Sequence, residues 1–142
     1  MNDHYILIGE DDSDDRYLIQ SAFDENNFTD TIKFLVNGVE IVQHLEDVLN
    51  GSCPKHYPRF ILMDLNMPKM DGKETLQKIK QHSEFQKIPV IIFSTNSNEQ
   101  EMRRCYELGA NSYITKPNNF DNLVKTIAAV RSYWLEMTNI PQ

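Results

Sequence analysis

Carboxylate, hydroxyl and ammonium side chains come directly after short apolar runs at four places in this sequence. They are Glu10, Asp11, Asp64, Ser94 and Lys116. Three carboxylates that converge repel one another unless one binds a proton or a cation lies among them. Oxygen ligands without His or Cys favour a hard ion such as Mg²⁺. With a lysine and a hydroxyl beside them, such a set could bind a phosphoryl group, and an aspartate could accept it as an acyl phosphate.

Each of these residues has an ordinary interpretation when it is taken singly. Acidic loop residues are usually solvated, a serine after a strand usually begins a turn or caps a helix, and a lysine there usually lies at the surface. The chemical interpretation therefore requires secondary structure that brings all five side chains to one place.

Five apolar runs alternate with helical patterns and predict five strand–helix units. The strands are expected at 5–8, 32–36, 60–63, 90–93 and 112–115. Apolar residues at helical spacing indicate the helices between them. These residues are Leu18, Ile19, Ala22 and Phe23, then Val42, Leu45 and Leu49, then Leu76 and Ile79 within 72–82, the stretch 99–108, and finally Leu123, Ile127, Val130 and Trp134.

Several of the strands are apolar throughout, which is typical of parallel sheets that helices cover on both sides. Right-handed crossovers then favour an α/β fold, a doubly wound five-stranded parallel sheet in the order 2-1-3-4-5, flavodoxin-like, with helices on both faces. Sites in such sheets form beyond the carboxyl ends of the strands. The first and third strands are neighbours in this order, so Glu10, Asp11 and Asp64 would share one crevice. Ser94 and Lys116 would lie beside it.

Length and composition set limits on the molecule. With 142 residues, 40% of them hydrophobic and 25% charged, the chain fits one ordinary globular domain. The net charge of −7 disfavours non-specific binding to nucleic acid and to anionic membrane surfaces. No apolar run approaches the roughly 20 residues of a membrane-spanning helix, and the polar start shows no signal peptide. We expect a cytoplasmic protein with Cys53 and Cys105 as reduced thiols.

Four segments, in this order, resemble the receiver domain of response regulators, the phosphoacceptor half of two-component signalling. They are IGEDD at 8–12, ILMDLNMPKMDG at 61–72, PVIIFST at 89–95 and GANSYITKP at 109–117. The resemblance extends over about residues 4 to 135. It implies a single receiver domain over 1–142, in which 132–142 extend the last helix. No residues would remain for a DNA-binding or enzymatic output domain.

The resemblance also implies a role for each acidic residue. Asp64 would be the phosphorylated aspartate. Asp11, Asp64 and the backbone carbonyl of Asn66 would bind Mg²⁺, and Glu10 would act on the ion largely through bound water. The domain would support only its own phosphoryl transfer and slow autodephosphorylation, so it would not be an enzyme in the usual sense.

Three further residues complete the site that the resemblance implies. Ser94 would hydrogen-bond the phosphoryl group, and Lys116 would pair with it. Tyr113 resembles the switch aromatic whose rotamer changes when Ser94 moves. The signal would then leave through the surface of the fourth helix, fifth strand and fifth helix around Tyr113.

The sequence departs from the common pattern of the family at several positions. Gly9 stands where a branched apolar residue is usual, and the sequence offers no reason for it. Glu10 replaces the commoner aspartate but keeps the charge, so metal binding should survive. Asn66 and Asn96 stand where the family tunes the lifetime of its phosphoryl group, and neither side chain is a general base that would activate water strongly.

A finer resemblance concerns the partners. The long loop before the third strand and the ending 132–137 resemble small stand-alone regulators, many associated with phytochrome-type histidine kinases. The donor would be a sensor histidine kinase or a histidine phosphotransfer protein, and the target an unidentified protein reached by contact. Neither nucleic acid nor a membrane is expected as a direct partner. Some members of the subgroup dimerise, so Trp134, Met137 and Ile140 are either packing residues or part of a homodimer surface.

Other interpretations of such a sheet fit less well. A phosphatase of the haloacid dehalogenase type would need an aspartate where Asn66 stands, and a flavin phosphate would be repelled by the acidic segment 10–12. The glycines never form the Gly-x4-Gly-Lys pattern of a nucleotide-binding loop. The alternative that stays open is a receiver-like interaction module that works without phosphorylation. Such modules usually lack the acceptor aspartate, the lysine or the acidic pair, and all three are present here.

Overall fold

The computed structural model describes residues 4–52 and 56–137, without the side chains of residues 136 and 137. The expectations for Cys53, for the Met137 side chain and for Ile140 lie outside the described residues. Cys105 is buried as a free thiol, as predicted.

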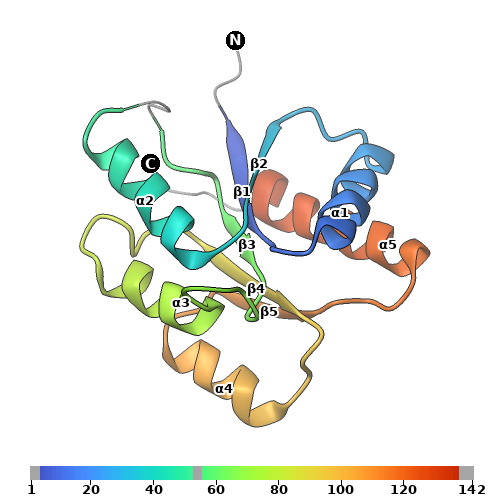
Figure 1. Cartoon of the computed structure of the whole chain (residues 1–142). Coiled ribbons are helices and arrows are strands. Elements are labelled where there is room, and N and C mark those ends of the chain that lie inside the picture. Colours follow the sequence, from blue (N-terminus) through green and yellow to red (C-terminus); the bar gives the residue numbers. More distant parts are fainter. Residues whose placement is uncertain (1–3, 53–55, 138–142) are drawn as a thin grey trace.

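Five strands alternate with five α-helices along the described part of the chain (Figure 1). In chain order they are β1 (Tyr5–Gly9), α1 (Ser13–Glu25), β2 (Thr31–Leu35), α2 (Gly38–Leu49), β3 (Ile61–Met63), α3 (Gly72–Gln81), β4 (Val90–Ser94), α4 (Glu99–Glu107), β5 (Ser112–Thr115) and α5 (Phe120–Arg131). A π-helical segment, Ser132–Met137, continues α5.

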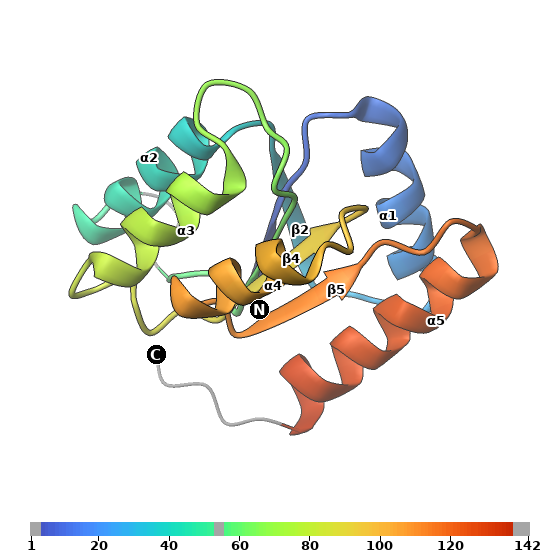
Figure 2. The same ribbon diagram turned by 90° about the horizontal axis from the view of Figure 1, so that it is seen from below.

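The strands form one sheet in the order β2-β1-β3-β4-β5, and all neighbouring pairs are parallel. Figure 2 shows α2 and α3 on one side of the sheet and α1 and α5 on the other. The predicted doubly wound fold is confirmed. Within residues 4–52 and 56–137, none of the helices has the length and apolar character that crossing a bilayer requires.

Alternate residues of the inner strands enter two separate apolar cores. Leu7, Ile61 and Ile92 pack in the core under α2, α3 and α4, whereas Ile8, Leu62 and other alternate positions pack under α1 and α5. Because both faces of each inner strand are buried, these strands read as continuous apolar runs in the sequence.

The inward faces of two helices differ from those predicted. On α1, Ile19, Ala22 and Phe23 are buried, but Leu18 is exposed. On α2, the buried apolar side chains are Ile41, Leu45 and Val48, whereas Leu49 is exposed and Val42 only half-buried. Both sets of α2 positions have helical spacing, so periodicity alone could not choose between faces one residue apart. The predicted faces of α3 and α5 are confirmed by buried Leu76, Ile79, Leu123, Ile127 and Val130. Trp134, the last residue of the predicted stripe, lies in the π-helical segment and is half-buried against the core under α1 and α5.

The packing of α2 on β1 explains Gly9. A Cβ atom at this position would lie 2.7 Å from Ile41 Cδ1 and 3.2 Å from Met67 Sδ. A larger side chain here would therefore require the ends of the Ile41 and Met67 side chains to shift.

Two arginines hold the C-terminal end of α5 against the rest of the domain. Arg131 Nη1 donates to the carbonyl of Asn26 at 2.7 Å, and Arg59 Nη2 donates to the carbonyl of Leu135 at 3.0 Å. Arg59 lies just before β3, and its N–H donates to the carbonyl of Tyr5 at the start of β1. The end of α5 is thus fixed at the amino ends of the central strands.

Candidate functional site

Lys116, the residue directly after β5, lies at the centre of three carboxylates. Its Nζ atom is 2.5 Å from Glu10 Oε1, 2.8 Å from Asp64 Oδ2 and 3.3 Å from Asp15 Oδ2. An ammonium group has three N–H donors, and these three contacts account for all of them. Glu10 follows β1 and Asp64 follows β3, so the carboxyl ends of the parallel strands bring these residues together as predicted.

Burial shapes the electrostatics of this cluster. The side chains of Glu10, Asp64 and Lys116 are only 2%, 11% and 10% exposed. Burial raises the pKa of the Glu10 carboxyl, although the hydrogen bond from Lys116 opposes this shift. Burial would lower the pKa of Lys116, but its hydrogen bonds to Asp64 and Glu10 outweigh that effect and raise it. The lysine is therefore a fixed cation at neutral pH.

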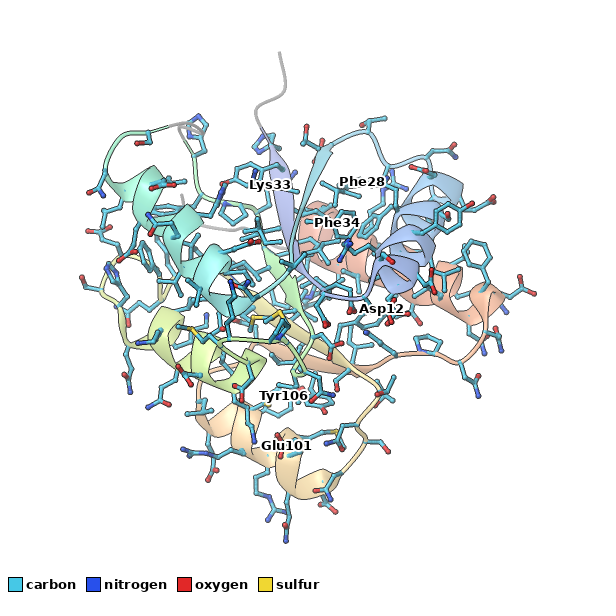
Figure 3. The ribbon with its side chains drawn as sticks, viewed as in Figure 1. Asp12, Phe28, Lys33, Phe34, Glu101 and Tyr106 are labelled. Carbon is cyan, nitrogen blue, oxygen red and sulfur yellow. The ribbon has the colours of Figure 1, made fainter. Side chains whose placement is uncertain are left out.

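The acidic loop between β1 and α1 has a well-defined backbone. Asp12, labelled in Figure 3, is the N-cap of α1, and its Oδ1 accepts the N–H groups of Asp14 and Asp15. Arg16 Nη1 donates to the carbonyls of Glu10 and Asp11 at 3.0 and 2.8 Å. The Asp11 side chain is exposed at the edge of this loop.

The segment after β3 is held from two sides. The N–H of Asp64 donates to the carbonyl of Gly9, and the N–H of Asn66 donates to Asp64 Oδ1 at 3.2 Å. Gly72, the first residue of α3, donates its N–H to the carbonyl of Leu65. A Cβ atom on Gly72 would lie only 2.4 Å from the Asp64 carbonyl oxygen, so only glycine fits beside the segment that carries Asp64.

Ser94 and Tyr113 are linked through the backbone of Asn96. The N–H of Asn96 donates to Ser94 Oγ at 3.2 Å, and Tyr113 Oη donates to the carbonyl of Asn96 at 2.5 Å. Ser94 is fully buried, and burial raises the pKa of the Tyr113 hydroxyl, although a hydrogen bond with Ser94 opposes this rise. Displacement of the Asn96 peptide would therefore alter the hydrogen bonds of both Ser94 and Tyr113.

Sequence reasoning missed three contributors to this arrangement: Asp15, Arg16 and Asn96 as a backbone bridge. Asp15 lies in the first turn of the helix that follows the acidic loop, and this nearness to Glu10 and Asp11 in the sequence was the available signal. Its contact with Lys116 joins residues 101 positions apart and requires the folded sheet. The role of Asn96 uses only backbone atoms, so its side-chain type carries no signal.

The carboxylate oxygens of this site suit a hard cation, but the side chains do not converge into a preformed metal-binding group. Among the described residues, no three or more His, Cys, Asp or Glu side chains are placed to hold an ion. Lys116 contacts both Glu10 and Asp64, while Asp11 is exposed. The site nonetheless offers only oxygen donors and an excess of negative charge, as Mg²⁺ requires. Metal binding by Asp11 and by the Asn66 carbonyl stays a prediction.

A family model described as the response regulator receiver domain matches residues 6–128. This chain belongs to the response regulator receiver domain family. The receiver is thus a signalling domain of two-component systems rather than a classic enzyme.

Similar proteins agree with this assignment. Response regulator Rcp1 of Synechocystis sp. is 34% identical over 137 residues, covering 96% of this receiver and 92% of Rcp1. The Mn²⁺-bound form of Rcp1 matches with a TM-score of 0.86 at 33% identity, over 98% and 99% of the two chains. The phosphorylated cyanobacterial phytochrome response regulator RcpA matches with a TM-score of 0.85 at 31% identity, over the same shares. FilR2 of Methanothrix harundinacea, described as a probable methanogenesis regulatory protein, is 35% identical over 136 residues, covering 96% of this receiver and 86% of FilR2.

Proposed function

We propose that this receiver accepts a phosphoryl group on Asp64 from a sensor histidine kinase or a histidine phosphotransfer protein, and signals by contact with another protein. The observation that carries the proposal is the position of Lys116. Its ammonium group joins Asp64 to Glu10 at the carboxyl ends of three strands. A buried lysine fixed beside a carboxylate is placed to neutralise phosphate oxygens as they arrive.

In the proposed transfer, a carboxylate oxygen of Asp64 attacks the phosphorus atom of a phosphohistidine. The P–N bond breaks as the new P–O bond forms, and the electron pair of the broken bond stays on the imidazole nitrogen. Lys116 balances the charge on the transferred oxygens, and the Ser94 hydroxyl hydrogen-bonds one of them. Glu10, Asp11, Asp64 and the Asn66 carbonyl would hold Mg²⁺. When bound, the ion supplies positive charge that stabilises the phosphoryl oxygens.

The transferred group changes the charge that Ser94 and Lys116 face. An acyl phosphate carries about two negative charges where the carboxylate carried one. Movement of Ser94 toward it would break the hydrogen bond that the Asn96 N–H donates to Ser94 Oγ. In this structure the Tyr113 ring is half-buried against the core under α2, α3 and α4. Displacement of the Asn96 carbonyl would release the Tyr113 hydroxyl, so that the ring can change position and alter the surface of α4, β5 and α5. This chain of contacts supports Tyr113 as the switch residue.

The similar proteins support the proposed phosphoryl donor and the proposed domain organisation. RcpA is a phytochrome response regulator, so a phytochrome-type kinase is the donor that we propose. The match to Rcp1, which covers 96% of this receiver and 92% of Rcp1, supports a single receiver domain over 1–142. The exposed rings of Tyr106 and Tyr133, on α4 and after α5, provide a surface for a downstream protein or a second copy of the chain.

Intact-mass spectrometry after treatment with acetyl phosphate and Mg²⁺ tests the proposal. We expect one phosphoryl mass increment on the wild type and none on Asp64→Asn. Asp14→Asn is the matched control, because it removes an exposed acid of α1 that does not contact Lys116 in the described structure. Labelling of Asp64→Asn to the wild-type level would place the acceptor elsewhere. Absence of labelling on the wild type would instead favour an interaction module that works without phosphorylation.

A further inference from the structure

Asp15 is the third carboxylate on Lys116, and it differs from the other two. Its side chain is 41% exposed, against 2% for Glu10 and 11% for Asp64, and its contact is the longest of the three. Asp15 also lines a small pocket between α1 and the segment after β5, together with Leu18, Phe93, Lys116 and Pro117. It therefore holds Lys116 from the solvent side of the site.

Lys116 has no N–H donor left for a new ligand while all three contacts persist. Phosphorylation of Asp64 would pass its own contact with Lys116 to the phosphoryl group, and any second phosphoryl oxygen would have to displace Glu10 or Asp15. Of these two carboxylates, Asp15 has the longer contact and the more exposed side chain. The same carboxylate adds a negative charge close to the position of a group that itself carries about two. Both effects favour the unphosphorylated state.

We propose that Asp15 is a positioning residue that competes with the phosphoryl group for Lys116 and so lowers the stability of the phosphorylated state. The inference rests on the proposed phosphorylation of Asp64. Asp15 touches Lys116 rather than the reacting atoms, so it sets how readily the lysine is released to the phosphoryl group.

The chain offers a closely matched control. Asp14 and Asp15 are adjacent acids in the first turn of α1, and both favour the N-terminus of the helix through its dipole. Asp14 is exposed and is not among the three carboxylates that contact Lys116. Asp14→Asn therefore reproduces the effect on helix and net charge without releasing Lys116.

The test is the affinity of the protein for beryllofluoride, a phosphoryl mimic, measured by NMR titration at saturating Mg²⁺. We expect Asp15→Asn to bind roughly two- to fivefold more tightly than the wild type, the range for loss of one partly exposed charge interaction. Asp14→Asn should change the affinity by less than about 1.5-fold, because its charge is solvated. Asp15→Glu restores the carboxylate and should return the affinity toward that of the wild type.

The outcomes separate this inference from the proposed function. If the wild type binds beryllofluoride and Asp15→Asn binds equally or more weakly, Asp15 does not compete for Lys116. An equal gain in Asp14→Asn would assign the effect to net charge and overturn the competition. If the wild type itself fails to bind beryllofluoride with Mg²⁺ present, the proposed phosphoacceptor function fails instead.

Discussion

At the scale of single residues, Lys116 offsets the charge repulsion between two buried carboxylates. Glu10 and Asp64 both contact its ammonium group, and both side chains are largely buried. Removing one partner of a buried ion pair is costly because the remaining charge stays buried without compensation. The stability of the domain and its chemistry therefore depend on the same lysine.

Lys116→Met should lower the free energy of unfolding by about 3 kcal/mol near neutral pH. The loss should shrink as the pH falls, for the following reason. Lys116 lowers the pKa of Glu10, which burial raises, so without Lys116 that pKa rises further. A carboxyl whose folded-state pKa is raised stabilises the fold below its unfolded pKa, and this stabilisation is lost as the pH rises through the folded pKa. Urea denaturation at about pH 5 and about pH 8 measures the difference.

Lys73→Met is the control for this pH dependence. Lys73 pairs with Glu101 at 2.7 Å, but its side chain is 40% exposed. Such surface pairs contribute roughly 0–1 kcal/mol, so the loss should be small and similar at both pH values. An equally large loss in Lys116→Met at both pH values would contradict the role assigned to Glu10.

Ser94→Ala should separate phosphorylation from switching. The variant keeps Asp64 and Lys116, so acetyl phosphate should still label it, but Asn96 loses its acceptor on Ser94. NMR of the Tyr113 ring should show a large shift on beryllofluoride addition in the wild type and little in Ser94→Ala. Thr95→Ala, which removes the exposed neighbouring hydroxyl, should respond like the wild type. Equal Tyr113 shifts in Ser94→Ala and the wild type would rule out the coupling through Asn96.

At the scale of elements, the junction of β3 and α3 sets the position of Asp64. Gly72→Ala should cost about 1–3 kcal/mol of stability, the usual cost of overpacking, and slow labelling by acetyl phosphate. The added methyl group would meet the backbone of Asp64 and Leu65, which cannot move without shifting the acceptor. Chemical denaturation and the rate of labelling provide the measurements.

Gly9→Ala provides the comparison for Gly72→Ala. Its added methyl group would meet the end of the Ile41 side chain, which can yield more easily than backbone. We therefore expect a smaller loss of stability and of labelling rate than in Gly72→Ala. A larger loss in Gly9→Ala would show that the α2 contact, and not the β3–α3 junction, limits the site.

Much of this element structure could be predicted because the inner strands are apolar on both faces and alternate with helices. The order of the strands then placed Glu10, Asp64 and Lys116 together. On α2, Leu45 was predicted correctly, but Val42 and Leu49 were predicted in place of Ile41 and Val48, because adjacent apolar residues give the same helical spacing. The reason for Gly9 lies in how closely α2 approaches β1, and the contact of Asp15 lies in how α1 meets the end of β5. Such distances between helices and strands are not encoded by any short pattern in the sequence.

At the scale of the whole molecule, a bound cation should raise the free energy of unfolding, because the net charge is −7 and carboxylates gather at one end of the sheet. Mg²⁺ at ten times its dissociation constant should stabilise the fold by about 1.4 kcal/mol, if it binds only the native state. The melting temperature should then rise by a few degrees, about 4 °C. Asp11→Ala should lose most of this rise, whereas Asp14→Asn should keep it. An unchanged response in Asp11→Ala, measured by thermal denaturation, would place the ion at another site.

The anchoring of α5 indicates where the protein can be tethered or fused without covering the acceptor site. Arg59 and Asp64 lie at opposite ends of β3, five residues or about 16 Å apart along the strand. Arg59 contacts both Tyr5 and Leu135, so the two ends of the described domain leave from the side remote from Asp64. A surface linker or fluorescent fusion attached beside Tyr5 or Leu135 would start at the amino ends of the strands, so a kinase would still reach the acceptor face of the tethered protein.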